Sequence, residues 1–139
     1  MDLTVVFFFA AIIIVGALLF AVIGLTKKGA KTLDVERYRS KWLAIEHHLK
    51  RDDTASYHMV VLNADKLLDQ ALRDRGLKGE TMGERMKNAA SMFSNRNNIW
   101  SAHKLRNQIA HDTDVHVTYD HARTALSNFK QALKDMGAI

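Results

Sequence analysis

An unbroken run of apolar side chains lies near the start of the chain. Residues 3–25 carry no charge, and Thr4 is the only clearly polar side chain among them. A helix rises about 1.5 Å per residue, so a run of this length can cross a hydrocarbon core of ~30 Å. A helix also satisfies its own backbone hydrogen bonds in lipid. The pattern predicts a transmembrane helix over residues 3–25, with the lipid bilayer as its partner.

A cleaved secretory signal peptide is the alternative interpretation of this run. A signal peptide has a basic region before a shorter apolar core, whereas here the basic residues Lys27, Lys28 and Lys31 follow the core. These features favour a retained anchor and a basic juxtamembrane hinge at residues 26–32. Because basic residues stay on the cytoplasmic side, we expect a single-pass protein of the cell membrane. Its N-terminus would lie outside and its C-terminal domain in the cytoplasm.

Beyond the hinge, apolar side chains recur every three or four positions, which is the spacing of amphipathic helices. Five such segments can be traced, at about residues 33–50, 54–75, from Thr81 onward, 99–111 and from Thr118 onward. Trp42 and Trp100 occupy apolar positions, which predicts that both belong to the core. The chain has no proline and no strand pattern of comparable length. The sequence therefore predicts an all-α protein in which residues 33–139 form an antiparallel bundle of about four to five helices.

Two local signals mark the ends of these helices. Gly76 stands where a glycine would end the helix at 54–75, because glycine adopts the left-handed conformation without strain. Thr81 and Glu84 have the spacing of a capping box, in which each side chain caps a backbone amide near the other residue.

Charge and cysteine usage narrow the range of partners and chemistry. All 20 Lys and Arg residues and 14 of the 15 acidic residues follow the anchor, which leaves this part at +6 with histidine neutral. Such a charge favours phosphate-bearing partners, either RNA or anionic lipid headgroups. The absence of cysteine excludes disulfides, zinc–thiolate sites and a cysteine nucleophile.

The candidate chemistry lies in residues 105–112, late in the predicted bundle. Arg106 is a permanent cation that can grip a phosphate, and His111 can transfer protons near neutral pH. Together they suffice to cut RNA without a metal. The 2′-hydroxyl attacks, His111 moves a proton, and Arg106 neutralises the charge that grows on the phosphate. Asn107 and Asp112 are candidate supporting residues.

Helical geometry limits how these two residues can meet. Residues five apart on a helix point about 140° from one another, so Arg106 and His111 do not share a face within a helix. They can converge if the helix ends at His111, or if the long arginine reaches round. In the alternative, structural interpretation, His111 favours the negative end of the helix and Arg106 pairs with Asp112 or Asp114.

The segment Arg106-Asn107-Gln108-Ile109-Ala110-His111 resembles the arginine-x4-6-histidine motif of the HEPN superfamily. The resemblance covers about residues 33–137. It implies a helical bundle that acts as a metal-independent endoribonuclease, of a kind often found in toxins or defence effectors with an antitoxin or regulatory protein. It also implies a homodimer in which two motifs face each other. Arg106 would then bind and orient the scissile phosphate, His111 would transfer a proton, and Asn107 would orient the site.

The resemblance leaves a second function open. Some members of the superfamily have lost nuclease activity and serve as binding or dimerisation modules, so a non-catalytic, membrane-tethered interaction module is the alternative. A subgroup carries a tyrosine two positions after the histidine, where a partner enzyme modifies it. Here that position is Thr113, so this modification is not expected.

A metal site is a further alternative. A helical phosphohydrolase of the HD type would need a histidine such as His47 or His58, then the pair His111-Asp112, and then Asp120. No spacing among these residues is diagnostic. We therefore expect neither a metal nor another cofactor.

Overall fold

The computed structural model describes residues 2–26 and 31–139, which belong to two separate compact units, Met1–Ala30 and Lys31–Ile139. The basic hinge predicted at residues 26–32 lies largely outside the described residues. Thr26 ends a helix, and Lys31 and Thr32 are the first residues of the second unit.

The first unit contains α1, which spans Leu3–Thr26. Over Leu3–Leu25 its mean hydropathy is 3.1, and by length and composition this helix is able to cross a membrane. All its side chains from residue 3 to residue 25 are exposed, including bulky phenylalanine and isoleucine side chains. An apolar surface of this extent requires lipid or another apolar partner to cover it.

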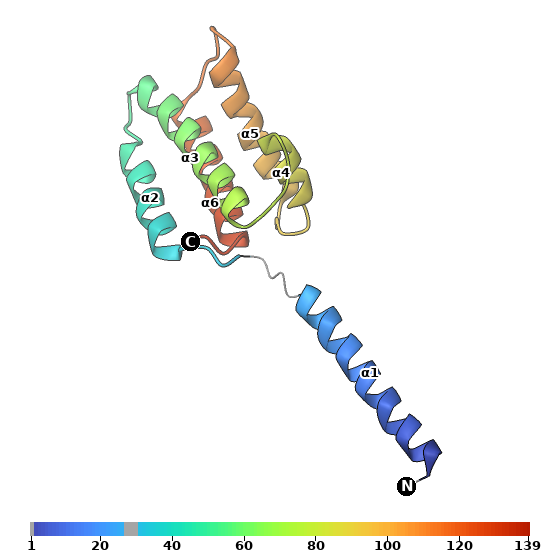
Figure 1. Cartoon of the computed structure of the whole chain (residues 1–139). Helices are drawn as coiled ribbons and strands as arrows, with labels where there is room; N and C mark the ends of the chain where they lie inside the picture. Colours follow the sequence, from blue (N-terminus) through green and yellow to red (C-terminus); the bar gives the residue numbers. More distant parts are fainter. Residues whose placement is uncertain (1, 27–30) are drawn as a thin grey trace. The chain divides into compact units, whose positions relative to one another are not determined.

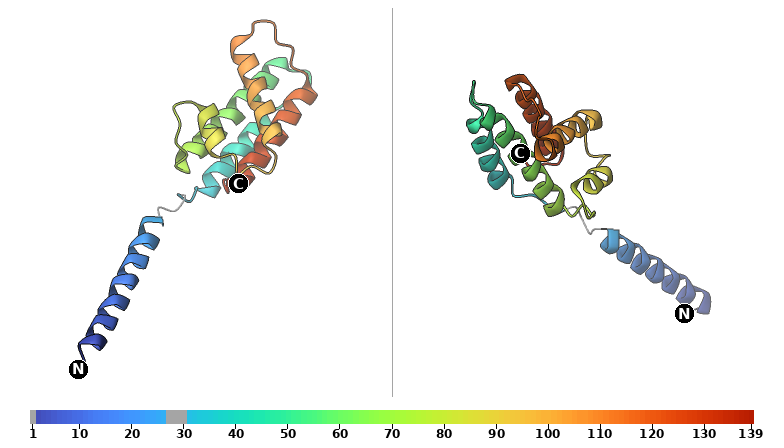
Figure 2. Two further views of the ribbon diagram at one scale, coloured as in Figure 1. Left: turned by 90° about the vertical axis from the view of Figure 1, so that its right-hand side faces the viewer. Right: turned by 90° about the horizontal axis from the view of Figure 1, so that it is seen from above.

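The second unit is a bundle of the five helices α2 to α6 (Figures 1 and 2). Their bounds are Val35–His48 for α2, Thr54–Asp74 for α3, Met82–Asn88 for α4, Arg96–His111 for α5 and Tyr119–Asp135 for α6. No strand occurs in the described ranges. The predicted all-α bundle is therefore confirmed.

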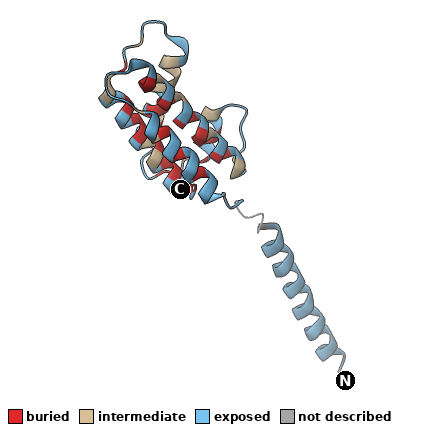
Figure 3. Cartoon of the chain, turned by 90° about the vertical axis from the view of Figure 1, so that its left-hand side faces the viewer, coloured by how far each residue is buried: buried red, intermediate tan, exposed pale blue. Residues whose placement is uncertain are grey.

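Helix α3 forms the centre of the bundle. It packs against α2, α5 and α6, and α4 also rests on it. Its apolar side chains recur at helical spacing, and those of Val60, Val61, Leu68 and Leu72 are completely buried. All five helices contribute buried residues, which Figure 3 marks as red segments. The two tryptophans differ in burial. Trp42 belongs to the core and is 2 % exposed, whereas Trp100 is only half-buried.

Side chains that cap backbone groups fix where the helices begin and end. Asp53 caps the start of α3, and Thr118 and His121 form a reciprocal capping box at the start of α6. Gly76 follows α3 with a φ of 89°, its own N–H donating to the Arg73 carbonyl while Leu77 N–H donates to the Leu72 carbonyl. This is the Schellman arrangement that glycine favours.

The sequence prediction is less accurate around α4. Thr81 caps the backbone of Glu84 as expected, but the Glu84 carboxylate accepts from the N–H of Glu80 rather than from Thr81, so the capping box is incomplete. The helix ends at Asn88, and turns occupy residues 89–92 although Ala89 and Phe93 continue the apolar rhythm and are buried.

Candidate functional site

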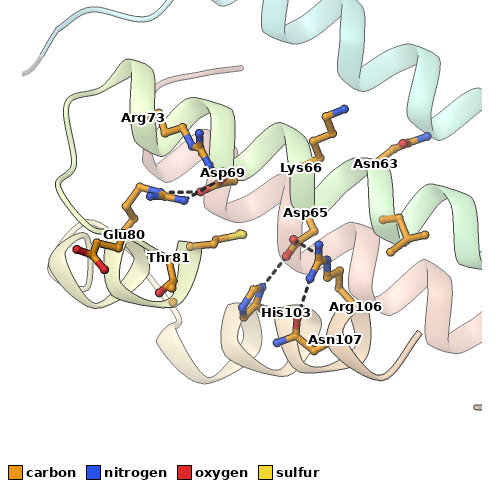
Figure 4. Close-up of a pocket in the computed structure, with 14 residues that line it drawn as sticks. Asn63, Asp65, Lys66, Asp69, Arg73, Glu80, Thr81, His103, Arg106 and Asn107 are labelled. Atoms are coloured by element: carbon orange, nitrogen blue, oxygen red, sulfur yellow. Dashed lines mark hydrogen bonds and ion pairs between the residues drawn. The ribbon is translucent and has the colours of Figure 1, made fainter. Parts of the chain in front are cut away.

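A polar groove of about 690 Å³ lies along α3, between the loop leading into α4 on one side and α5 on the other (Figure 4). Four of its lining residues are Lys or Arg and three are Asp or Glu. They are Lys66, Arg73, Arg85, Arg106, Asp65, Asp69 and Glu80. A groove with this mixture can hold a ligand that carries both negative charge and hydrogen-bond donors.

Asp65 is the central residue of the groove. It projects from α3 and is 3 % exposed, although it lies among the apolar positions that face the core. One of its oxygens, Oδ1, lies 2.7 Å from Nδ1 of His103, and the other, Oδ2, lies 3.3 Å from Nε of Arg106. A buried carboxylate is costly unless it is paired and hydrogen-bonded, so these two contacts explain how Asp65 is tolerated there.

Arg106 is thereby held at the edge of the groove. Its side chain is 36 % exposed. While Nε faces Asp65, Nη1 donates a 2.9 Å hydrogen bond to Oδ1 of Asn107. Figure 4 shows the chain of contacts from His103 through Asp65 to Arg106 and Asn107. Arg106 therefore pairs with Asp65 on α3, and not with Asp112 or Asp114 as the structural interpretation of the sequence expected.

His111 lies elsewhere. It is the last residue of α5, as predicted, and it is exposed, with Asp112 as the exposed C-cap. Neither residue lines the groove, and the described contacts contain no bond between His111 and Arg106. The structure thus brings Arg106 and Asn107 together in one site and leaves His111 and Asp112 outside it within a single chain.

A second ion-pair cluster forms the opposite wall of the groove. Arg85, which is 5 % exposed, places Nε 2.7 Å from Oδ1 of Asp69 and donates from Nη1 to the Gly79 carbonyl. Arg73 also pairs with Asp69, at 3.0 Å. Gly79 has a φ of 154°, and a Cβ there would lie 2.8 Å from the backbone nitrogen of Arg85. The loop can therefore approach Arg85 closely only with glycine at this position.

Sequence reasoning missed Asp65 and His103. A signal for Asp65 existed, because an acidic residue stands between Ala64 and Leu68 on the most regular apolar stripe of the chain. His103 precedes Arg106 by three positions, so both lie on one face of α5. The missing information was which part of α3 faces that side of α5.

Within residues 2–26 and 31–139, no group of three or more His, Asp or Glu side chains is arranged to hold a metal ion. The residues considered for an HD-type centre accordingly do not assemble into one there.

Comparison of the chain with protein-family models, with curated proteins and with solved structures finds no significant match.

Proposed function

We propose that this protein is a membrane-tethered, HEPN-like domain that binds RNA and cleaves it without a metal ion. The observation that carries the proposal is the presentation of Arg106 in an open groove by a buried carboxylate. The Asp65 carboxylate contacts Nε of Arg106, and Asn107 accepts a hydrogen bond from Nη1. The remaining donors of the guanidinium are left for a ligand. A guanidinium fixed in this way suits a phosphate, whose oxygens accept several hydrogen bonds at once.

The charge of the groove supports an anionic ligand. Arg73 and Arg85 share the single carboxylate of Asp69, and Arg106 pairs with Asp65. Lys66 is exposed on the same groove and forms no ion pair with another described residue. Its ammonium group can therefore meet a second phosphate of a bound strand.

The position of His111 leads us to propose a homodimer. Arg106 and His111 of one chain point about 140° apart on α5 and are separated by about 7.5 Å along its axis. The resemblance to HEPN domains implies that two motifs face each other. His111 of one copy would then approach the phosphate held by Arg106 of the other, and would transfer a proton while Arg106 stabilises the charge on the phosphate.

The apolar helix α1 supports the membrane part of the proposal. Its length and composition suit a bilayer, and the lysines that follow it favour the orientation with the bundle in the cytoplasm. The domain would then act on RNA near the inner face of the cell membrane. A protein antitoxin or regulator remains a prediction of the resemblance.

The test is RNA cleavage by the full chain in detergent micelles with EDTA present. We expect the parent to cleave single-stranded RNA, and Arg106→Ala and His111→Ala to lower the rate by about 10²- to 10⁴-fold. Arg39→Ala and His47→Ala serve as matched controls, because both residues are exposed on α2 and neither lines the groove. Absence of cleavage by a folded parent would refute the nuclease proposal.

One observation favours the alternative of a non-catalytic interaction module. Asp65 joins α3 to α5 by contacting His103 and Arg106, so these two contacts stabilise the fold even without a substrate. In that case Arg106→Ala would lower the unfolding temperature, His111→Ala would leave it unchanged, and neither would change any reaction with RNA. The cleavage assay separates the two functions, and thermal unfolding followed by circular dichroism shows whether each assayed variant is folded.

A further inference from the structure

We infer that His103 is a second proton-transfer group of the proposed RNA cleavage, and that Asp65 is its positioning residue. This inference rests on the proposed function. In the reaction, the bond from phosphorus to the 2′-oxygen forms and the bond to the 5′-oxygen breaks, leaving a 2′,3′-cyclic phosphate. One proton leaves the 2′-oxygen and one is delivered to the departing 5′-oxygen. His111 supplies one such group, and Arg106 supplies none because a guanidinium does not give up its proton.

The contacts of His103 fix which of its nitrogens is available. Nδ1 lies 2.7 Å from Oδ1 of Asp65, and a carboxylate accepts hydrogen bonds, so Nδ1 carries the hydrogen of this contact. Nε2 is then the nitrogen that can exchange a proton with a substrate. Nε2 is not one of the fully buried nitrogens that lack a hydrogen-bond partner. His103 also lines both the groove and an adjoining cavity of about 540 Å³.

His103 and Arg106 are also held side by side. The two oxygens of the Asp65 carboxylate each contact one of them, and the two residues are three positions apart on one face of α5. A phosphate bound by the free donors of Arg106 would therefore lie on the face of α5 that also carries His103. Figure 4 shows both side chains converging on Asp65 from the same helix.

The imidazole is further restrained by Trp100. The two rings meet edge to face, with centroids 6.0 Å apart and planes at 77°. Asp65 at 3 % exposure and His103 at 8 % leave little room for rearrangement. A proton-transfer group that is oriented before the substrate arrives is what general acid–base catalysis requires.

The experiment measures the pH–rate profile of the full chain in micelles with EDTA, using a single-stranded oligoadenylate. Affinity is measured separately with the 2′-O-methyl form of the same oligonucleotide, which lacks the nucleophile. The variants are His103→Gln, which keeps a hydrogen-bonding group of similar size, and Asp65→Asn, which keeps the shape but loses the charge. The charged groups that line the two cavities together with His103 come from α3, the loop before α4, α4 and α5, and are Asp65, Lys66, Asp69, Arg73, Glu80, Arg85, Lys104 and Arg106.

We expect the parent profile to be bell-shaped, and His103→Gln to lose one of its two limbs with a rate about 10²- to 10⁴-fold lower. Asp65→Asn should displace the same limb, and His103→Gln should not change affinity for the 2′-O-methyl strand by more than about twofold. A His103→Gln variant that is folded and keeps both limbs and the parent rate would overturn the inference. If it does not fold, an unchanged profile for Asp65→Asn overturns it. If the parent does not cleave RNA, the proposed function is refuted as well. If His111→Ala loses cleavage while the His103 variant keeps it, only the role of His103 is refuted.

Discussion

Buried polar side chains of this protein are concentrated at one place. Four polar or charged residues are buried in the described ranges, namely Ser56, Asp65, Arg85 and His103, and the last three line the groove beside Arg106. A folded domain gains little from burying such groups, even when they are paired. Their gathering at one open groove supports the proposal that this groove binds a ligand.

Tyr38 and Asp74 form a hydrogen-bonded pair that does not line the groove and that stabilises the fold. The Tyr38 hydroxyl donates to Asp74 and joins α2 to α3. Burial and then this hydrogen bond raise the pKa of Tyr38, so the hydroxyl stays a donor at neutral pH. The same hydrogen bond is the main reason that the pKa of Asp74 is lowered. We expect Tyr38→Phe to reduce the free energy of unfolding by about 1–2 kcal/mol at pH 7.

The pH dependence of this effect has a definite sign. A carboxyl whose pKa is lowered by folding contributes stability above its ordinary pKa, and the contribution is lost as the pH falls through the lowered value. The difference between parent and Tyr38→Phe should therefore shrink below about pH 4. Denaturant unfolding at pH 7 and pH 3 measures it. An equal difference at both pH values would contradict the role of the ionised carboxylate.

Helices with strong end signals were predicted most accurately. The bounds of α3 differ from the prediction by one residue, because Asp53 caps its start and Gly76 ends it. The end of α4 was missed because Ala89 and Phe93 continue the apolar rhythm after the backbone has turned. Periodicity reports which side chains are buried, and it does not report whether the backbone between them is helical.

Because periodicity describes each helix separately, only part of the site could be predicted from the sequence. Arg106 and Asn107 were found from the local motif, since they are neighbours in the sequence. Asp65 and His103 are 38 positions apart, and their contact depends on how α3 and α5 face each other. A single sequence gives the buried stripe of each helix but not the pairing of stripes between helices.

The Schellman ending of α3 depends on the positive φ of Gly76. A Cβ at Gly76 would meet no atom within 4 Å, so Gly76→Ala introduces backbone strain without a collision. We expect a loss of about 1 kcal/mol in the free energy of unfolding, and a smaller loss for Gly76→Asn, because asparagine tolerates a positive φ better. Chemical denaturation of the three proteins decides the matter, and equal stability of alanine and glycine at this position would refute the capping role.

The two units differ in the chemistry of their surfaces. The unit with α1 exposes an apolar surface that suits a bilayer, and the bundle carries the basic excess and the groove. A membrane-tethered chain is confined to a surface, which raises the chance that two copies meet. The proposed homodimer is therefore compatible with a weak interface between bundles.

Cleavage by mixed dimers tests the proposed shared site most directly. Full-length Arg106→Ala and His111→Ala chains, each inactive alone, would be produced together and assayed on RNA with EDTA. If Arg106 of one copy works with His111 of the other, a mixed dimer contains one intact pair. The mixture should then recover up to about a quarter of the parent rate, because random pairing makes half of the dimers mixed. If the parent cleaves RNA but the mixture does not, the shared site is contradicted. If the parent itself does not cleave RNA, the proposed nuclease activity is contradicted.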